Sequence, residues 1–368
     1  MNQLLSTLIG KHFFFSSATI KLITEIILAL IHIRDVNLTS IALVICQGTQ
    51  VDSGYKKLQR FFAKIKICEV SLAKLIVKLS GLEGTKFSLI LDRTNWKFGQ
   101  KHINILVLSV SYRSIGIPIL WNMLDNCGGN SNSVQRVDLL DKFIKIFSVT
   151  AIDNLLADRE FIGDKWLSFL AEEGVNFYIR IKSNLTVGRS GQELVTANAK
   201  IKKLKNNERL ILQGERYLGK NYLGPKVKVA AMRNHKGELC IIATNDNSDQ
   251  AFEIYRQRWA IENLFGCLKT RGFNFENTHM VDLGKIDKLL AILAISFTIC
   301  HITGIWRNEI KPIKIKKHGR KAMSLFRYGL DFLREIFFHP LSFRKEISKI
   351  SSVFRGALSV NLNSIIIC

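Results

Sequence analysis

The chain has 368 residues, of which 47% are hydrophobic and 23% are charged. This composition can bury a sizeable core and excludes a disordered chain, and the length is enough for about two to three domains. Lys and Arg outnumber Asp and Glu by 53 to 30, a formal net charge of +23. Such an excess points to a polyanionic partner or to an anionic membrane surface.

The positive charge is concentrated in two sectors. Residues 180–238 contain 14 basic and 4 acidic side chains, and residues 307–368 contain 13 and 4. The rest of the chain is close to neutral. A near-neutral body with two basic sectors indicates a nucleic-acid footprint, with general solubility as the alternative.

The cysteines and the apolar segments bear on location. The seven cysteines are widely spaced without a C-x-x-C pair, which favours a reducing, cytoplasmic setting, and no two histidines have the i, i+4 spacing of a helical zinc site. The N-terminal segment does not have the pattern of a signal peptide. Residues 289–306 are apolar enough to span a membrane, but they contain polar residues and have no second span. We therefore expect a buried core helix and no membrane partner.

Residues 1–80 are predicted to be helical. Apolar residues recur at helical spacing over 20–33, a second short helix follows Asn37, and a third is predicted to begin near Ser53, capped by its side chain. The third helix carries Lys56, Lys57 and Arg60. Three short helices with a basic last one predict a DNA-binding domain, and a helical bundle with a basic face is the alternative.

The pattern changes to strands and helices after about residue 84. Near-continuous apolar runs predict strands covered on both faces. The loop GGNSNS (128–133) predicts a turn with a helix cap. The elements expected in order are strands at 87–92, 103–112 and 117–121, a helix at 133–147, a strand at 152–157, a helix to about 173 and a strand at 176–182. This order predicts an α/β fold.

The following segment is polar and basic. Residues 183 to about 238 break the α/β pattern, and the runs VKVAAM and LCIIATN then indicate strands. We expect a partly β insertion, followed by a long helix that starts near Ser248 or Asp249. The tail after about residue 307 is predicted to be basic and weakly helical.

Two aspartates occupy corresponding places in the predicted sheet. Asp92 closes the first strand and Asp158 closes the strand at 152–157. Ligands of open α/β sheets gather at the carboxyl ends of strands. Each aspartate alone is weak evidence, because an aspartate at a strand end more often caps a turn or a helix.

A third acid lies on the predicted long helix. At 100° per residue, Tyr255, Arg258, Glu262 and Lys269 fall within about 60° of one another. This stripe presents an acid between cations, and a solvated face with an i, i+4 ion pair is the alternative.

Together the three acids suggest metal-dependent phosphoryl transfer. Three carboxylates can hold a pair of Mg²⁺ ions, which stabilise the attacking and leaving oxygens of an in-line phosphoryl transfer. Arg258 could then grip a phosphate, Lys269 act as a point charge and Tyr255 donate one hydrogen bond.

Three motifs carry a resemblance to a known family. The spacing Y-x2-R-x3-E-x6-K from Tyr255 to Lys269 resembles the signature of the DDE transposases of insertion sequences, specifically family four. LDRTNW (91–96) is similar to the motif of the first aspartate, ADREF (157–161) to that of the second and YRQRWAIE (255–262) to that of the glutamate. The close resemblance covers about residues 85–280.

The resemblance implies a domain organisation. It implies a ribonuclease H-like α/β catalytic domain at 81–306 with a β-rich insertion at about 183–245. A helical DNA-binding domain at 1–80 precedes this domain, and a basic helical tail at 307–368 follows it.

The resemblance also implies an activity. Such enzymes bind the terminal inverted repeats of an element, free a 3′ hydroxyl and join it to target DNA, as dimers on double-stranded DNA. Asp92, Asp158 and Glu262 would be the catalytic residues and the ligands of two Mg²⁺ ions, with Mn²⁺ as a substitute. The DNA-binding residues expected are Tyr255, Arg258, Lys269, Arg159 and Trp259.

Several interpretations remain open from the residues themselves. Arg93 and Arg159 could touch phosphate or pair with a neighbouring carboxylate, and Trp259 could stack on a base or pack in the core. No tryptophan lies between Trp166 and Trp259, whereas relatives that form a DNA hairpin use one in the insertion. The alternative functions are a DNA-binding protein without catalysis and a nuclease without strand transfer.

Overall fold

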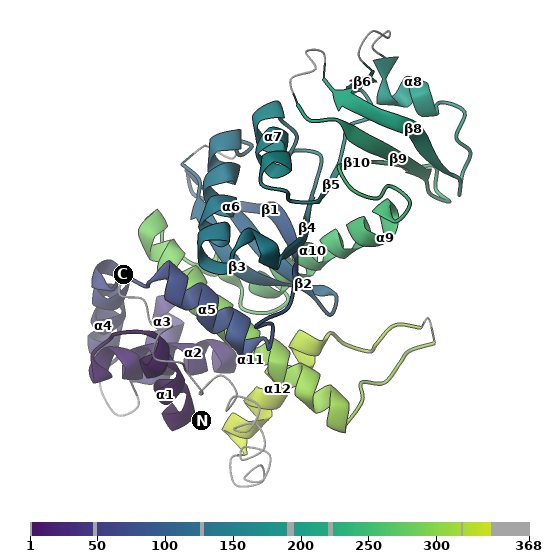
Figure 1. The fold of residues 1–368 in the computed structure, drawn as a ribbon. Coiled ribbons are helices and arrows are strands. Elements are labelled where there is room, and N and C mark those ends of the chain that lie inside the picture. Colours follow the sequence, from purple (N-terminus) through teal and green to yellow (C-terminus); the bar gives the residue numbers. More distant parts are fainter. Residues whose placement is uncertain are drawn as a thin grey trace. The chain divides into compact units, whose positions relative to one another are not determined.

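The computed structural model describes residues 2–46, 50–125, 129–189, 195–219, 224–317 and 319–339. The chain forms two compact units (Figure 1). The helical unit comprises Met1–Glu83, Trp96–Ile103 and Leu264–Cys368, and the sheet unit comprises Gly84–Asn95 and Asn104–Asn263. The domain boundaries expected after residues 80 and 306 stay predictions, and residues 340–368 of the predicted tail lie outside the described residues.

The described N-terminal part of the helical unit is built from five helices. Their bounds are α1 (Asn2–His12), α2 (Ser17–Ile33), α3 (Leu38–Ile45), α4 (Val51–Lys64) and α5 (Glu69–Leu79). The side chain of Asn37 accepts the N–H of Thr39 and caps α3. The predicted cap at Ser53 is wrong, because α4 begins at Val51 and Ser53 lies inside its first turn.

The apolar segment at 289–306 forms part of α11 (Leu283–Ile310), which packs against α2, α4, α5 and α12 (Leu325–Phe338). In the described part of the chain, α11 alone is long and apolar enough to cross a membrane, unless the bent pair α2 and α3 is counted as a second span. The protein buries 94% of the most apolar window of α11. The prediction of a buried core helix is confirmed.

The sheet unit contains one mixed sheet. Its strands are β1 (Phe87–Phe98), β2 (Lys101–Tyr112), β3 (Ile115–Met123), β4 (Ile152–Ala157), β5 (Phe177–Arg180), β6 (Thr186–Gly188), β7 (Val195–Thr196), β8 (Arg209–Leu218), β9 (Val227–Arg233) and β10 (Leu239–Thr244). The strand order is β3-β2-β1-β4-β5-β10-β9-β8-β6-β7. β1, β4 and β5 run parallel, whereas β10 is antiparallel to both β5 and β9. The expected α/β class is therefore confirmed.

The strands and helices of this unit closely follow the predicted ranges. β4 and α6 (Ser133–Phe147) have the predicted bounds, and α6 is capped by Asn132 as the GGNSNS loop indicated. Figure 1 shows α6 together with α7 (Asp164–Glu172) over the sheet. β1 differs, because it continues six residues beyond its predicted end into a hairpin with β2. Gly99, at φ 58°, provides the turn, a conformation that glycine adopts without a steric penalty.

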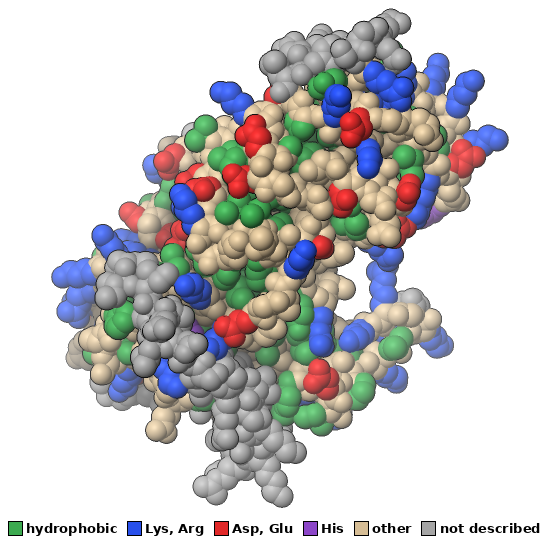
Figure 2. Space-filling model, viewed as in Figure 1, with side chains coloured by type: hydrophobic (Ala, Val, Ile, Leu, Met, Phe, Trp, Pro, Cys, Tyr) green, Lys and Arg blue, Asp and Glu red, His purple; other side chains and the backbone are tan. Residues whose placement is uncertain are grey.

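The β-rich insertion extends the sheet instead of forming a separate layer. β6 to β9 and α8 (Ala197–Ile201) follow β5, and β10 returns to pair with the free edge of β5. Arg209 and Arg216 of β8 and Lys228 and Arg233 of β9 belong to the basic sector 180–238. Figure 2 shows Lys and Arg side chains along the outer edge of this part.

The predicted long helix is interrupted. It consists of α9 (Ala251–Tyr255), the 3₁₀ turn η2 (Arg256–Arg258) and α10 (Trp259–Leu268). α9 contacts β5 and β10, and η2 contacts β4. A 3₁₀ turn advances about 120° per residue, compared with 100° in an α-helix, so the angles of a continuous helix do not hold across it. Arg258, the last residue of this turn, lies beside the point where the pairing of β1 with β4 ends.

Candidate active site at the carboxyl ends of the parallel strands

The two aspartates lie at one level of the sheet. Leu91 of β1 is in register with Ala157 of parallel β4, and Asp92 and Asp158 directly follow these residues. Each carboxylate accepts the backbone N–H of the next residue, at 2.8 Å for Asp92 and 2.6 Å for Asp158. The pairing of β1 with β4 thus brings together two acids that are far apart in the chain.

Arg258 connects the first aspartate to the glutamate. Its Nη1 donates to Asp92 Oδ2 at 3.1 Å, and its Nη2 donates to Glu262 Oε1 at 2.5 Å. The Arg258 side chain is only 11% exposed, compared with 18% for Asp92 and 35% for Glu262. One buried guanidinium therefore lies between two carboxylates, one from a strand and one from α10.

The protonation of Asp92 is shifted by its surroundings. Burial raises its pKa to about 6, because a buried carboxylate loses the hydration that stabilises its charge. The guanidinium of Arg258 and the Arg93 N–H oppose this shift, while the carboxylates of Asp158 and Glu160 add to it. A carboxylate that ionises this reluctantly is one that a nearby cation would stabilise strongly.

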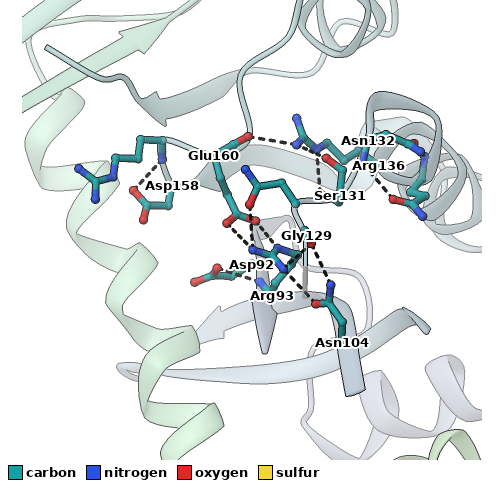
Figure 3. Close-up of polar contacts among 12 residues, drawn as sticks. Asp92, Arg93, Asn104, Gly129, Ser131, Asn132, Arg136, Asp158 and Glu160 are labelled. Atoms are coloured by element: carbon teal, nitrogen blue, oxygen red, sulfur yellow. Dashed lines mark hydrogen bonds and ion pairs between the residues drawn. The ribbon is translucent and has the colours of Figure 1, made fainter. Parts of the chain in front are cut away.

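A second ion pair joins the two segments that follow the paired residues of β1 and β4. Arg93 donates through Nε to Glu160 Oε1 at 2.6 Å and through Nη2 to Glu160 Oε2 at 2.9 Å. Its remaining hydrogen bonds reach Asn104 Oδ1, the Gly129 carbonyl and Asn130 Oδ1. Figure 3 shows this pair beside Asp92. Because Arg93 follows Asp92 and Glu160 lies two residues after Asp158, the pair ties the positions of both aspartates.

The match to a protein family is consistent with this geometry. Residues 88–299, more than half of the chain, match the family described as "Transposase DDE domain". The chain belongs to this family. No match to a curated protein was found.

A solved structure is also similar to this DDE-domain chain. It is the "piggyBac transposase synaptic complex with hairpin DNA", with 13% sequence identity and a TM-score of 0.38. The match covers 73% of this chain and 57% of the other, so the DDE-domain chain spans less than two thirds of that transposase.

Four of the predicted DNA-binding residues lie in the sheet unit of this DDE-domain chain. Trp259 is 61% exposed and Arg159 is also exposed. The Arg258 guanidinium lies 5.8 Å from the centre of the Tyr255 ring. The Tyr255 hydroxyl is buried, and it has no hydrogen-bond partner within the described ranges.

The last predicted residue, Lys269, lies just beyond the end of α10 in the helical unit. It pairs with Glu276 at 2.7 Å and lies 5.8 Å from the centre of the Trp96 ring. The structure therefore brings Lys269 to an acid of its own unit.

A pocket of about 740 Å³ adjoins the Arg258 ion pairs. Its lining residues include the cations Arg113, Arg256 and Arg258 together with Tyr255 and Trp259. The pocket thus combines guanidinium donors with aromatic surfaces, a combination that suits phosphates and bases.

The sequence reasoning missed residues that organise this site. Glu160 and Arg136 were not predicted, although Arg136 lies on the apolar stripe of α6 with Leu139, Leu140 and Phe143. A charged residue on an apolar stripe can be recognised in the sequence as a residue that organises its surroundings, because a buried charge must be hydrogen-bonded. Arg136 is buried and donates to the backbone carbonyls of Ser131 and Glu160. No comparable signal singles out Glu160.

The metal site expected from the acids is not preassembled. Among the described residues, no group of three or more His, Cys, Asp or Glu side chains is arranged to hold a metal ion. Asp92 and Glu262 instead share the Arg258 cation. The set of donor atoms, carboxylate oxygens on rigid elements, still has the chemistry that hard divalent cations prefer.

Proposed function

We propose that this protein is a metal-dependent DNA transposase of the insertion-sequence type, family four, which cleaves the ends of an element and joins them to target DNA. The observation that carries the proposal is the approach of Asp92 and Glu262 to one cation, Arg258, beside Asp158. These are the three acids of the motifs, and their chain belongs to the transposase DDE domain family.

The fold supports a ribonuclease H-like core. The first five strands of the sheet have the order β3-β2-β1-β4-β5, and β1, β4 and β5 are parallel. Both aspartates follow residues that are paired between β1 and β4. This is the placement expected for a catalytic core with acids on its central strands.

The donor set fits Mg²⁺. Asp92, Asp158 and Glu262 would hold two ions, with Mn²⁺ as a substitute, because all three offer carboxylate oxygens. When bound, the ions would supply charge stabilisation to the attacking and leaving oxygens of phosphoryl transfer. The protein's own contribution is to orient the acids through the Arg93–Glu160 pair and to offer the guanidiniums of Arg256 and Arg258 to phosphate.

The proposed partners are the terminal inverted repeats and the target DNA, held by a homodimer in the cytoplasm. Arg159, Trp259, Tyr255 and Arg258 are the proposed contacts near the site, and Lys269 of the helical unit is a further proposed contact. A basic pocket of about 650 Å³ in the helical unit offers a second phosphate surface, lined by Lys56, Gln59, Arg60, Ala63, Lys64 and Lys285. Figure 2 shows blue side chains gathered in the region of α4.

The test is a strand-transfer assay. Purified protein is incubated with Mg²⁺, a target plasmid and labelled DNA from the borders of its reading frame. We expect a joined product, and we expect Glu262→Gln to reduce end cleavage at least about 100-fold, because it removes a metal ligand. End binding should stay within about threefold of wild type.

The outcomes separate the candidate functions. Unchanged cleavage by Glu262→Gln would remove this residue from the mechanism. Cleavage without joined product would indicate a nuclease. Salt-sensitive binding without strand scission under any divalent ion would indicate a DNA-binding protein that has lost catalysis.

A further inference from the structure

We propose that Arg258 occupies the place of a divalent cation in the DNA-free protein, and that it releases Asp92 and Glu262 when a DNA phosphate binds its guanidinium. The inference rests on the proposed function and adds to it a coupling between DNA binding and metal binding at one residue.

The first observation is the position of the guanidinium. Its two terminal nitrogens each donate to a different carboxylate, at 3.1 Å to Asp92 and at 2.5 Å to Glu262. An arginine is charged at every physiological pH, so it neutralises these acids permanently while it stays there. A divalent ion bound by the same two oxygens would have to take the same place.

The second observation is that Arg258 also borders open space. It lines the pocket of about 740 Å³ together with Arg256 and Gln257 of the same 3₁₀ turn. A phosphate in this pocket would meet two guanidiniums, and arginine binds phosphate with two parallel hydrogen bonds. Arg258 lines this pocket, whereas Asp92 and Glu262 are not among its lining residues.

The electrostatics make the exchange cooperative. A guanidinium that left without replacement would leave the largely buried Asp92 carboxylate and the half-buried Glu262 carboxylate without a cation, which is costly above all for Asp92. A divalent ion that arrived while Arg258 remained would meet a like charge at contact distance. Phosphate binding to Arg258 and metal binding to the acids therefore favour each other, and linkage requires the same factor in both directions. The DNA-free protein thus holds divalent ions weakly.

The experiment measures Mn²⁺ binding to the full chain by electron paramagnetic resonance of the free ion, with and without a short duplex DNA. The proteins are wild type, Arg258→Gln and Arg258→Lys, and thermal unfolding checks that each is folded. Arg256→Gln is the matched control, because it removes a neighbouring cation from the same pocket and leaves the Arg258 ion pairs in place. Glu262→Gln with the same duplex measures the ions that the DNA itself binds.

We expect the duplex to tighten Mn²⁺ binding to the wild type by about 5- to 150-fold, the usual range of coupling between sites. Arg258→Gln should bind Mn²⁺ more tightly than wild type without DNA, by a similar factor, and should show little further effect of the duplex. Arg258→Lys should lie between the two, since it keeps the charge but offers one donor group. Arg256→Gln should behave like wild type without DNA.

Two results would overturn the inference. If Mn²⁺ binding depends on Glu262 but is the same in wild type and Arg258→Gln, the coupling is wrong and the proposed function stands. If no variant shows Mn²⁺ binding that depends on Glu262, both the inference and the proposed metal-dependent function fail.

Discussion

Asp92 combines two opposing influences on its charge. Its pKa is raised to about 6 by burial, although the Arg258 guanidinium lies 3.1 Å away. The raised pKa means that the free-energy cost of removing the carboxylate from water exceeds the stabilisation that the ion pair provides. A site with this balance gains free energy when a further cation approaches, which is why the raised pKa agrees with a metal-binding role.

The raised pKa predicts how stability depends on pH. The folded protein holds the Asp92 proton more tightly than the unfolded chain, whose ordinary value is 3.8. The corresponding stability is fully present below about pH 4 and is lost as the pH rises through about 6. Asp92→Asn should therefore stabilise the metal-free protein by about 1 to 3 kcal/mol at pH 7.5 and by less at pH 5.

Urea unfolding in the presence of EDTA at both pH values would check this prediction. Asp125→Asn, at an exposed position, controls for the loss of one carboxylate. A stability difference between wild type and Asp92→Asn that is the same at both pH values would contradict the raised pKa.

Two ion pairs of equal length differ in burial, so they test whether burial decides how much an ion pair contributes to stability. Arg93–Glu160 and Lys145–Asp141 both measure 2.6 Å, but the side chains of the first pair are 11% and 23% exposed, compared with 73% and 41% for the second. Glu160→Gln should lower the free energy of unfolding by about 2 to 4 kcal/mol, because it leaves a largely buried guanidinium without its charged partner. Asp141→Asn should cause no measurable change, since water screens an exposed pair.

Chemical denaturation of both variants is the measurement. Mn²⁺ binding is a second measurement. Glu160→Gln should weaken it, because without the Arg93–Glu160 pair the two aspartates are held less firmly. Equal stability losses in the two variants would show that burial does not decide the strength of these pairs.

At the scale of elements, the interrupted helix α9–η2–α10 decides the site. A continuous helix would place Tyr255, Arg258, Glu262 and Lys269 on one stripe. The 3₁₀ turn changes the angle between Tyr255 and the residues of α10, and Lys269, just beyond α10, pairs with Glu276. Arg258 and Glu262 keep their i, i+4 relation, and Arg258 also pairs with Asp92. Short 3₁₀ turns inside helices often mark functional positions, and this one carries Arg256, Gln257 and Arg258.

The contact between α11 and α12 depends on two glycines. A Cβ at Gly304 would overlap the carbonyl oxygen of Leu325, and a Cβ at Gly329 would overlap that of Cys300. The two helix backbones therefore approach each other closely through these positions. We expect Gly304→Ala to destabilise the protein by about 2 kcal/mol or more, because backbone atoms cannot move aside as a side chain can.

Thermal and urea unfolding would check this prediction. Gly284→Ala in the first turn of the same helix is the control, because its Cβ would meet only the end of the Asp282 side chain at 3.3 Å. Its stability should stay within about 1 kcal/mol of wild type, as expected for an alanine in place of a helical glycine. A Gly304→Ala variant as stable as Gly284→Ala would show that α11 and α12 can separate without cost.

At the scale of the whole molecule, the net charge of +23 is the dominant property. Part of it lies on α4, whose apolar side is buried and whose exposed side presents Lys56, Arg60 and Lys64. Lys288 of α11 donates to the Phe62 carbonyl near the end of α4. Lys285, also on α11, lines the basic pocket. This surface has the charge that a DNA backbone requires.

The basic surface makes a prediction about salt dependence. Replacing Lys56 and Arg60 together by Gln should weaken DNA binding and lower the slope of log affinity against log salt by about 2, if each contacts one phosphate. Lys142 and Lys145, which pair with Asp138 and Asp141, provide the matched double control. Fluorescence anisotropy over a salt series measures both. An unchanged slope in the Lys56/Arg60 variant would exclude this surface from DNA binding.

Much of this protein could be predicted from the sequence because the relevant signals are local. Apolar periodicity placed β4, α6 and α11 close to their observed positions, and the cap at Asn132 follows from the chemistry of a single side chain. The motifs around Asp92, Asp158 and Glu262 were visible as spacings. Charge counting located the basic sectors, since the charge of a side chain needs no fold to be known.

Only the tertiary structure decided how these parts meet. The pairing of β1 with β4, the return of β10 to β5 and the 3₁₀ turn before α10 depend on contacts between residues far apart in the chain. So do the ion pairs of Arg93 with Glu160 and of Arg258 with Asp92, which join segments that no periodicity relates. The physical reason is that a charged side chain has a definite partner only after burial has removed the competing water.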